Sequence, residues 1–503
     1  MATPLNTASC GTPAPSRSRR LEDPSDRFEE ACGVFGVLAA RQEVANLAYF
    51  GLYALQHRGQ ESAGMAVFDA DRVRLHKDMG LVANVFDKEL LLRLHGSLAI
   101  GHNRYSTMGS SSICNAQPVV LQTSRGPFAL AHNGNLVNPR QLREGLQVAD
   151  SAMVSTSDSE LIAFALQQAV EQGHDWPEAI AMAARLCQGA FSLCIGTPVG
   201  LFGLRDQHGL RPLVFGQITD AGHGGWVISS ETCGLDIIGA SHIADVQPGE
   251  LLWFRPGARA PEQRQWITAD PHLCIFEMIY FSRPDSIFFG ESLYSYRRRL
   301  GERLAQESPV EADLVIGVPD SGIPAAIGYA TASRIPFSEG LVKNRYVGRT
   351  FIQPSQAMRE AGIRVKLNPL PDVLSGQRIA VIDDSIVRGS TSRKLIRALR
   401  DAGAREVHMR ISSPPVTHPC FYGIDTDSQD QLIAANCTLE QIIEHLGVDS
   451  LAYLSKEGMI ESARQSGRPF CSACFDGQYP VPPDADMRSS KLMLEPAGLA
   501  AQL

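Results

Sequence analysis

Two adjacent aspartates, Asp383 and Asp384, directly follow four apolar residues, Ile379 to Ile382, that predict a buried parallel strand. A turn of small and hydroxyl-bearing residues comes next, and then an amphipathic run over 392–400 that predicts a helix. Backbone N–H groups at the start of such a helix lack intrahelical partners and bind phosphate. The carboxylates would repel a bare phosphate, but they suit ribose hydroxyls and a Mg²⁺ ion that carries a diphosphate.

The segment from Arg378 to Thr391 resembles the phosphoribosyl-diphosphate motif of the type I phosphoribosyltransferases. The resemblance implies that Asp383 and Asp384 contact the ribose hydroxyls and the shell of one Mg²⁺ per subunit. A second loop, Pro319 to Gly322, would hold the diphosphate, with Ser321 near the metal. The 5-phosphate would lie in the loop after the aspartates, against Ser385, Arg388, Gly389, Ser390 and Thr391.

A basic segment lies between these two loops. From Lys343 to Lys366 the chain has six basic residues against one acid, Glu360. It supplies the local positive charge that a diphosphate needs, so we expect Lys343 to bind it and the segment to close as a lid. A solvated basic loop is the alternative interpretation.

A second group of chemically capable residues begins at Cys32, which opens an apolar, strand-like run. Four polar clusters stand beside later strand-like runs, where side chains converge on a sheet edge: residues 56–62, 101–107, 131–136 and 157–160. This set resembles the class II glutamine amidotransferases, whose chain begins at a catalytic cysteine. The resemblance implies a glutamine and oxyanion site with an arginine for the α-carboxylate, an aspartate for the α-ammonium group and two oxyanion donors. In that order these are Arg104, Asp158, and the Asn133 amide with the Gly134 N–H, and Thr107 belongs to the same site.

In that family the free α-amino group of the cysteine is the general base. An α-amine titrates near pH 8, which suits it to accept a thiol proton. The mechanism requires that residues 1–31 be removed by cleavage between Ala31 and Cys32. Composition alone makes this Ser- and Pro-rich stretch a disordered tail, which is compatible with a propeptide.

Both half-sites in one chain resemble the amidophosphoribosyltransferase family. Ammonia released from glutamine would displace diphosphate from 5-phospho-α-D-ribose 1-diphosphate to give 5-phospho-β-D-ribosylamine, the committed step of purine synthesis. The resemblance also implies purine-nucleotide inhibitors and a homotetramer.

Cys471 and Cys474 form a C-x-x-C pair, which suits zinc, an iron–sulfur cluster or a redox disulfide. Resemblance to the cluster-bearing members of the family adds Cys274 and Cys420 and favours one [4Fe–4S] cluster per subunit. Cys437 competes for the fourth position, but it precedes a helical run and is interpreted as structural.

The elements around these residues predict two architectures. Strands and helices without strict alternation indicate α+β layers at first, and βα units indicate an open parallel α/β sheet afterwards. The family implies an N-terminal-nucleophile αββα sandwich followed by a type I phosphoribosyltransferase domain. The expected division is a propeptide over 1–31, a glutaminase domain over 32–260, a phosphoribosyltransferase domain with the cluster ligands over 261–480, and a tail over 481–503.

Bulk composition limits the partners. The 503 residues are 44% hydrophobic and 20% charged with a net charge of −8, so no global positive field attracts nucleic acid. No apolar run approaches the roughly 18 residues of a membrane span. Eleven cysteines without a secretory signal predict reduced thiols in the cytoplasm.

Two rival functions share part of this pattern. An amino-sugar synthase of the same amidotransferase class would share the first half, but it needs sugar-phosphate isomerase domains and has no use for Asp383 and Asp384. A non-catalytic phosphoribosyltransferase-like regulator predicts a basic surface and a helix-turn-helix motif. It would also leave Cys32 and Arg104 unexplained.

Overall fold

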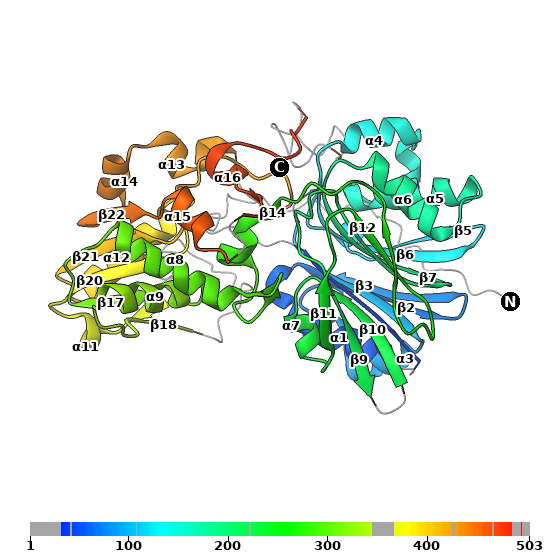
Figure 1. Cartoon of the computed structure of the whole chain (residues 1–503), viewed down its shortest axis with the longest axis horizontal. Helices are drawn as coiled ribbons and strands as arrows, with labels where there is room; N and C mark the ends of the chain where they lie inside the picture. Colours follow the sequence, from blue (N-terminus) through cyan, green and yellow to red (C-terminus); the bar gives the residue numbers. More distant parts are fainter. Residues whose placement is uncertain are drawn as a thin grey trace, which may run out of the picture.

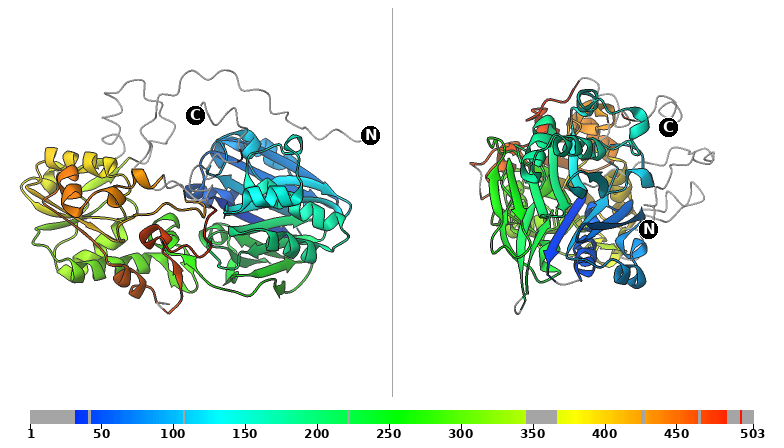
Figure 2. Two further views of the ribbon diagram at one scale, coloured as in Figure 1. Left: turned by 90° about the horizontal axis from the view of Figure 1, so that it is seen from above. Right: turned by 90° about the vertical axis from the view of Figure 1, so that its right-hand side faces the viewer.

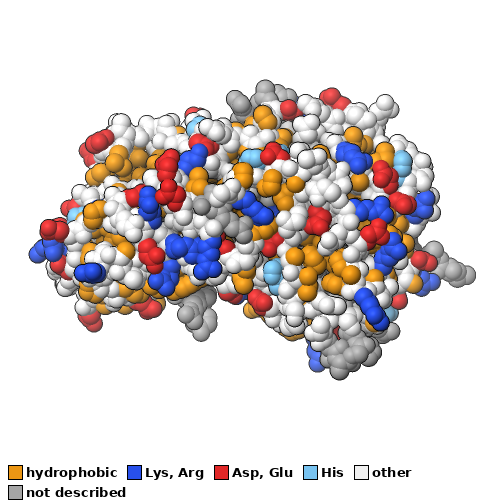
Figure 3. All heavy atoms as spheres, viewed as in Figure 1, with side chains coloured by type: hydrophobic (Ala, Val, Ile, Leu, Met, Phe, Trp, Pro, Cys, Tyr) orange, Lys and Arg blue, Asp and Glu red, His pale blue; other side chains and the backbone are white. Residues whose placement is uncertain are grey.

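The computed structural model describes residues 32–40, 43–106, 108–220, 223–344, 367–424, 428–464, 467–484 and 494. Two lobes lie side by side along the long axis, with the earlier part of the chain (blue to green) in one and the later part (yellow-green to orange) in the other (Figure 1). Acidic and basic side chains are interspersed on the face shown in Figure 3, in keeping with the modest net charge of −8. None of the helices within the described residues has the length and apolar character needed to cross a membrane.

The first lobe contains two antiparallel sheets packed face to face. The seven-stranded sheet has the order β11 (Ser241–Asp245), β9 (Val214–Asp220), β10 (His223–Ser229), β1 (Gly33–Ala39), β4 (Leu98–Arg104), β2 (Ser62–Asp69) and β3 (Arg72–Met79). The six-stranded sheet has the order β13 (Glu262–Gln265), β12 (Glu250–Phe254), β8 (Gly200–Arg205), β7 (Gly189–Thr197), β6 (Gly126–Leu136) and β5 (Val119–Thr123).

Alternation along β1 shows how the layers form. Val34 and Leu38 enter the core between the sheets, whereas Phe35 and Val37 enter the core beneath the outer helix α1. The six-stranded sheet is covered on its outer face by α5 and α6. The layer order is therefore helix, sheet, sheet, helix, and the αββα sandwich is confirmed. The outer helices are α1 (Val44–Ala54), α5 (Asp158–Glu171) and α6 (Trp176–Leu186).

The second lobe is built on a parallel sheet, which confirms the second predicted architecture. Its order is β17 (Leu314–Gly317), β20 (Arg378–Asp383), β21 (Glu406–Ile411) and β22 (Ser450–Tyr453). One face packs against α8 (Leu293–Glu307) and α9 (Ile323–Ser333), and the other against α12 (Ser390–Asp401) and α14 (Leu439–Leu446). Strands β18 (Leu341–Lys343) and β19 (Leu367–Pro369) pair as a two-stranded antiparallel ribbon. In the sequence they precede and follow residues 345–366, which lie outside the described part of the chain.

The segment over 467–484 (red) runs between the lobes in two perpendicular views (Figures 1 and 2). Cys471 and Ala473 belong to the core of the first lobe, whereas Phe475 belongs to the core of the second. The remaining short elements are α2 (Val82–Val85), α3 (Lys88–Arg93), α4 (Pro139–Leu146), α7 (Cys233–Asp236), α11 (Pro371–Leu374), α13 (Ile433–Asn436), α15 (Lys456–Glu461), α16 (Ala473–Asp476), β14 (Leu273–Cys274), β15 (Ile287–Phe288), β16 (Glu291–Ser292) and β23 (Phe470–Cys471).

Glycine permits the close contact of α8 and α9. A Cβ at Gly328 would lie 1.9 Å from the carbonyl oxygen of Arg298, so Gly328→Ala must separate the two helices. We expect a loss of about 2 kcal/mol or more in the free energy of unfolding, measured by urea denaturation. The matched control is Gly145→Ala in the exposed part of α4, where a Cβ meets nothing within 4 Å. That change should stabilise by about 0.5–1 kcal/mol, and equal effects at both positions would contradict the prediction.

Candidate functional sites

Asp383 and Asp384 lie at the carboxyl end of β20 and are only 5% and 3% exposed. The backbone N–H of Asp384 donates to Asp383 Oδ1 at 3.0 Å, and the Ser385 hydroxyl donates to Asp384 Oδ1 at 2.6 Å. Ser321 also donates its hydroxyl to the Asp384 carboxylate. The structure therefore brings Ser321 to the paired acids, as the expected magnesium site requires.

The loops on either side of the acids lie close to the sheet. Val318 N–H donates to the Ile382 carbonyl at 2.9 Å, and a Cβ at Gly322 would lie 2.6 Å from that same oxygen. Gly389 is left-handed, with φ of 82°, at the N-cap of α12. The residues predicted to bind the 5-phosphate lie in the loop between β20 and α12 and in the first turn of α12: Ser385, Arg388, Gly389, Ser390 and Thr391.

Lys343 ends β18 and forms an ion pair with Asp320 of the opposite loop. It is the one basic residue of the predicted lid within the described residues, because 345–366 lie outside them. The prediction that this segment closes over substrate stays a prediction.

Cys32 precedes β1 and lies opposite the end of β4, since Gly33 pairs with Asn103. Its side chain is buried, and its thiol lies 3.5 Å from the carbonyl oxygen of Tyr105. Burial raises the pKa of the Cys32 thiol to about 12, with Arg104 opposing and the carboxylates of Glu61 and Asp158 adding to the rise. Burial therefore favours the protonated form of this thiol.

Arg104 and Asp158 are held in place by different hydrogen bonds. Arg104 donates to the Ser106 hydroxyl at 2.7 Å and to the Met108 carbonyl at 3.0 Å, and it lies 3.8 Å from Glu61. Asp158 is the first residue of α5 and accepts the backbone N–H of Leu136 at 2.8 Å. Both side chains are nearly fully buried, at 2% and 3% exposure, so their orientation is fixed by the fold.

Asn133 is fully buried in β6, and among the described residues its side-chain nitrogen and oxygen have no hydrogen-bond partner. Buried side-chain amides are normally hydrogen-bonded within the protein. The Asn133 amide is an exception, which leaves it available to hydrogen-bond a ligand. Gly134 follows with φ of 142°, and a Cβ there would lie 2.1 Å from the Ala190 carbonyl oxygen. Thr107, predicted for the same site, lies outside the described residues.

The four predicted cluster cysteines lie together between the lobes. Cys274 of β14 pairs in parallel register with Cys471 of β23. The Cys474 carbonyl accepts the N–H groups of Thr417 and His418 at 3.0 and 3.1 Å, which holds the loop of Cys420 beside it. Burial raises the pKa of Cys474, and the charges of Cys274, Cys471 and Cys420 raise it further. Cys437, the competing ligand, is exposed after α13.

The sequence analysis placed Arg58 in the polar cluster 56–62 but missed the buried charges that it joins, here named the interlobe ion cluster: Arg58, Arg211, Glu231 and Glu277. Arg58 binds Glu231 at 2.6 Å and Glu277 at 2.7 Å, and Arg211 binds Glu277 at 3.0 Å. All four side chains are at most 1% exposed. The pairs are 173 and 219 positions apart for Arg58, and no local pattern could indicate them.

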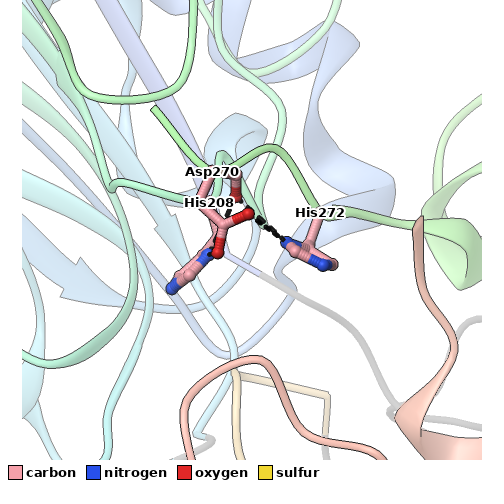
Figure 4. A group of neighbouring side chains, drawn as sticks. All are labelled: His208, Asp270 and His272. Atoms are coloured by element: carbon pink, nitrogen blue, oxygen red, sulfur yellow. Dashed lines mark hydrogen bonds and ion pairs between the residues drawn. The ribbon is translucent and has the colours of Figure 1, made fainter. Parts of the chain in front are cut away.

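His208, Asp270 and His272 were missed as well (Figure 4). Both imidazoles place Nδ1 near the Asp270 carbonyl oxygen, at 2.8 and 3.0 Å, and flank its carboxylate. The backbone around them is paired, because His272 N–H donates to His208 and Cys274 N–H donates to Leu210. The group therefore fixes the course of the chain into Cys274.

Comparisons with known proteins agree with this arrangement. A family model described as a glutamine amidotransferase domain matches residues 102–236. The chain is 65% identical over 476 residues to the amidophosphoribosyltransferase of Synechococcus elongatus, covering 94% of this chain and 96% of the relative. It is 45% identical over 463 residues to that of Bacillus subtilis, covering 90% and 95%. The solved B. subtilis glutamine phosphoribosylpyrophosphate amidotransferase with ADP and GMP has a TM-score of 0.83 at 44% identity, covering 90% of this chain and 98% of that one.

The second rival function, a non-catalytic regulator, finds no support in these relatives. Similarity extends over both lobes, so it includes the strand ends at Cys32 and at Asp383 alike. The chain therefore belongs to the amidophosphoribosyltransferase family, and it transfers ammonia from glutamine to phosphoribosyl diphosphate in the first step of purine biosynthesis.

Proposed function

We propose that Cys32 is the nucleophile of the glutaminase reaction once residues 1–31 are removed. The observation that carries this proposal is the position of the buried Cys32 thiol. It lies opposite Arg104 at the end of β4, and the carboxylate of Asp158 is near enough to affect its pKa. Because burial raises the pKa of the thiol to about 12, a dedicated base is needed. A new α-amine at Cys32 would take the thiol proton and return it to the departing ammonia.

The glutamine would be held by Arg104 at its α-carboxylate and by Asp158 at its α-ammonium group. Attack of Cys32 Sγ on the side-chain amide carbon forms a C–S bond and moves the carbonyl electrons onto oxygen. The unpaired Asn133 amide and the Gly134 N–H would stabilise that oxyanion. Collapse breaks the C–N bond and leaves a glutamyl thioester, which water hydrolyses.

At the second site, we propose that Asp383 and Asp384 hold the ribose 2′- and 3′-hydroxyls. The loop from Ser385 to Thr391 would bind the 5-phosphate through its N–H groups, and Lys343 the diphosphate. Ser321, Asp383 and Asp384 would supply oxygen atoms to the shell of one Mg²⁺, which neutralises charge on the leaving diphosphate. Ammonia then attacks C1, and the C1–O bond to diphosphate breaks with inversion.

We further propose that Cys274, Cys420, Cys471 and Cys474 hold one [4Fe–4S] cluster. The segments that carry these thiols lie side by side, since Cys274 pairs with Cys471 and the Cys474 carbonyl accepts from Thr417 and His418 near Cys420. Four thiolates suit either Zn²⁺ or an iron–sulfur cluster, and the resemblance to cluster-bearing members of the family favours [4Fe–4S].

Regulation, assembly and location are also proposals. Purine nucleotides would inhibit the enzyme, because the related B. subtilis enzyme was solved with ADP and GMP. The homotetramer rests on family resemblance. Nine of the ten cysteines within the described residues are free thiols, which supports a reducing compartment, the cytoplasm.

The nucleophile is tested by Cys32→Ala. Glutamine-dependent diphosphate release should be lost, while release with added ammonia is retained, because only the second site then acts. Intact-mass analysis of the active protein should show Cys32 as its first residue. A fully active chain that begins earlier would contradict the proposal.

The oxyanion donor is tested by Asn133→Ala. We expect kcat with glutamine to fall by about 10²–10³-fold. The free energy of unfolding should hardly change, because the Asn133 amide has no partner to lose. Asn138 is the matched control, since its amide bonds both Leu186 and Gln188 at 3.0 and 2.9 Å. Asn138→Ala should cost about 1–2 kcal/mol of stability and keep kcat, and a reversed pattern would contradict the assignment.

The cluster ligands are tested by iron and sulfide analysis of protein purified without oxygen. The native chain and Cys437→Ser should both contain about four irons per subunit. Cys420→Ser should lose them. Zinc in the native protein, or loss of iron in Cys437→Ser alone, would overturn the ligand set.

A further inference from the structure

Arg58 connects the interlobe ion cluster to the predicted nucleophile. Its Nε donates to the backbone carbonyl of Cys32 at 3.0 Å, while its two Nη atoms bind carboxylates. That carbonyl belongs to the residue that carries both the thiol and, after cleavage, the α-amine. The orientation of one guanidinium group therefore fixes the backbone of the nucleophile.

Glu277 sets that orientation from the second lobe. It binds Arg58 with both oxygens, at 2.7 and 3.0 Å, and also accepts from Arg211 at 3.0 Å and from the Ser282 hydroxyl at 2.8 Å. A bidentate pair restrains direction as well as distance. Glu277 follows Cys274 by three residues and begins a π-helical turn, Glu277–Phe281.

Arg211 extends the contacts to the loop of another thiol. Its Nε and Nη2 atoms donate to the Tyr422 carbonyl at 2.9 and 2.8 Å. The N–H of Tyr422 in turn donates to Cys420 Sγ at 3.4 Å. Glu277 thus joins Arg58 to two segments that carry predicted cluster ligands.

The loop after Cys420 also touches the oxyanion residue. A Cβ at Gly423 would lie 3.1–3.3 Å from the backbone atoms of Gly134, and Gly423 has φ of 101°. Only glycine adopts this conformation and this approach without strain. The thiol-bearing segments therefore reach the glutaminase site in two ways, through Glu277 and Arg58 to the Cys32 carbonyl and by direct contact of Gly423 with the Gly134 backbone.

We propose that Glu277, acting through Arg58, is a positioning residue for the nucleophile of the glutaminase reaction. Gly423 acts in the same way on the oxyanion donor Gly134. The inference rests on the proposed role of Cys32. It means that glutamine cleavage depends on the geometry of the thiol-bearing segments, whereas chemistry at the phosphoribosyl site does not.

The test is Glu277→Gln, which keeps the side-chain shape and removes the charge that orients Arg58. We expect kcat with glutamine to fall by about tenfold, because small misplacements of a nucleophile are costly. KM for glutamine should change less than about twofold, since Arg104 and Asp158 hold the substrate. The ammonia-dependent reaction should stay within about twofold, which also shows that the variant is folded.

A second readout does not use turnover. A diazoketone analogue of glutamine alkylates the nucleophilic thiol, and intact mass measures the rate. Glu277→Gln should slow alkylation by about the same factor as kcat. Gly423→Ala, which disturbs the oxyanion residue by contact with Gly134, should slow glutamine cleavage with ammonia-dependent activity retained.

The matched control is Glu291→Gln. Glu291 is also a buried acid of the second lobe, but it pairs with Arg299 and the Arg464 backbone rather than with Arg58. It should leave the alkylation rate unchanged. Equal loss of both reactions in Glu277→Gln, or no loss of either, would overturn the inference. Glutamine-dependent activity in Cys32→Ala would instead overturn the proposed nucleophile, so the two failures are distinct.

Discussion

The interlobe ion cluster is the constraint on which the relative placement of the two lobes depends. Burial alone would lower the pKa of Arg58, but Glu277 and Glu231 outweigh it and raise that pKa. Burial would likewise raise the pKa of Glu231, yet His57 and Arg58 hold it below its ordinary value. Each charge is stable in the interior only because its partners are in place, and an unpaired buried ion costs several kcal/mol. The lobes consequently meet in one geometry.

The two proposed sites differ in whether their polar side chains are already hydrogen-bonded within the protein. At the proposed glutaminase site, the fold leaves the neutral side-chain amide of Asn133 without a hydrogen-bond partner among the described residues, as the proposed oxyanion donor requires. At the phosphoribosyl site, the carboxylates of Asp383 and Asp384 are already restrained by neighbouring N–H and hydroxyl groups. The first arrangement suits a transient oxyanion, and the second suits a substrate and metal that arrive with fixed charges.

Local pattern was sufficient to predict the strand and helix around Asp383, since apolar runs and a following amphipathic run depend on near neighbours. The polar clusters at strand ends indicated that Cys32 and Arg104 converge on one sheet edge, but their roles came from the family resemblance. It could not reveal Glu277 as a partner of Arg58, because an ion pair between distant positions leaves no local periodicity. The contact of Gly423 with Gly134 could not be predicted for the same reason, because it joins a loop to strand β6, almost 300 positions earlier in the sequence.

The charges of the ion cluster are unequally divided between the lobes. Arg58, Arg211 and Glu231 come from the first lobe, whereas Glu277 comes from the second. A first lobe made alone would keep two guanidinium groups with one carboxylate, and a second lobe made alone would expose a carboxylate built to be buried. Neither lobe alone contains the partners for all of its buried charges. Although the two reactions take place in different lobes, gene fragments that encode either half would specify proteins with unpaired charges on the face that the other half covers.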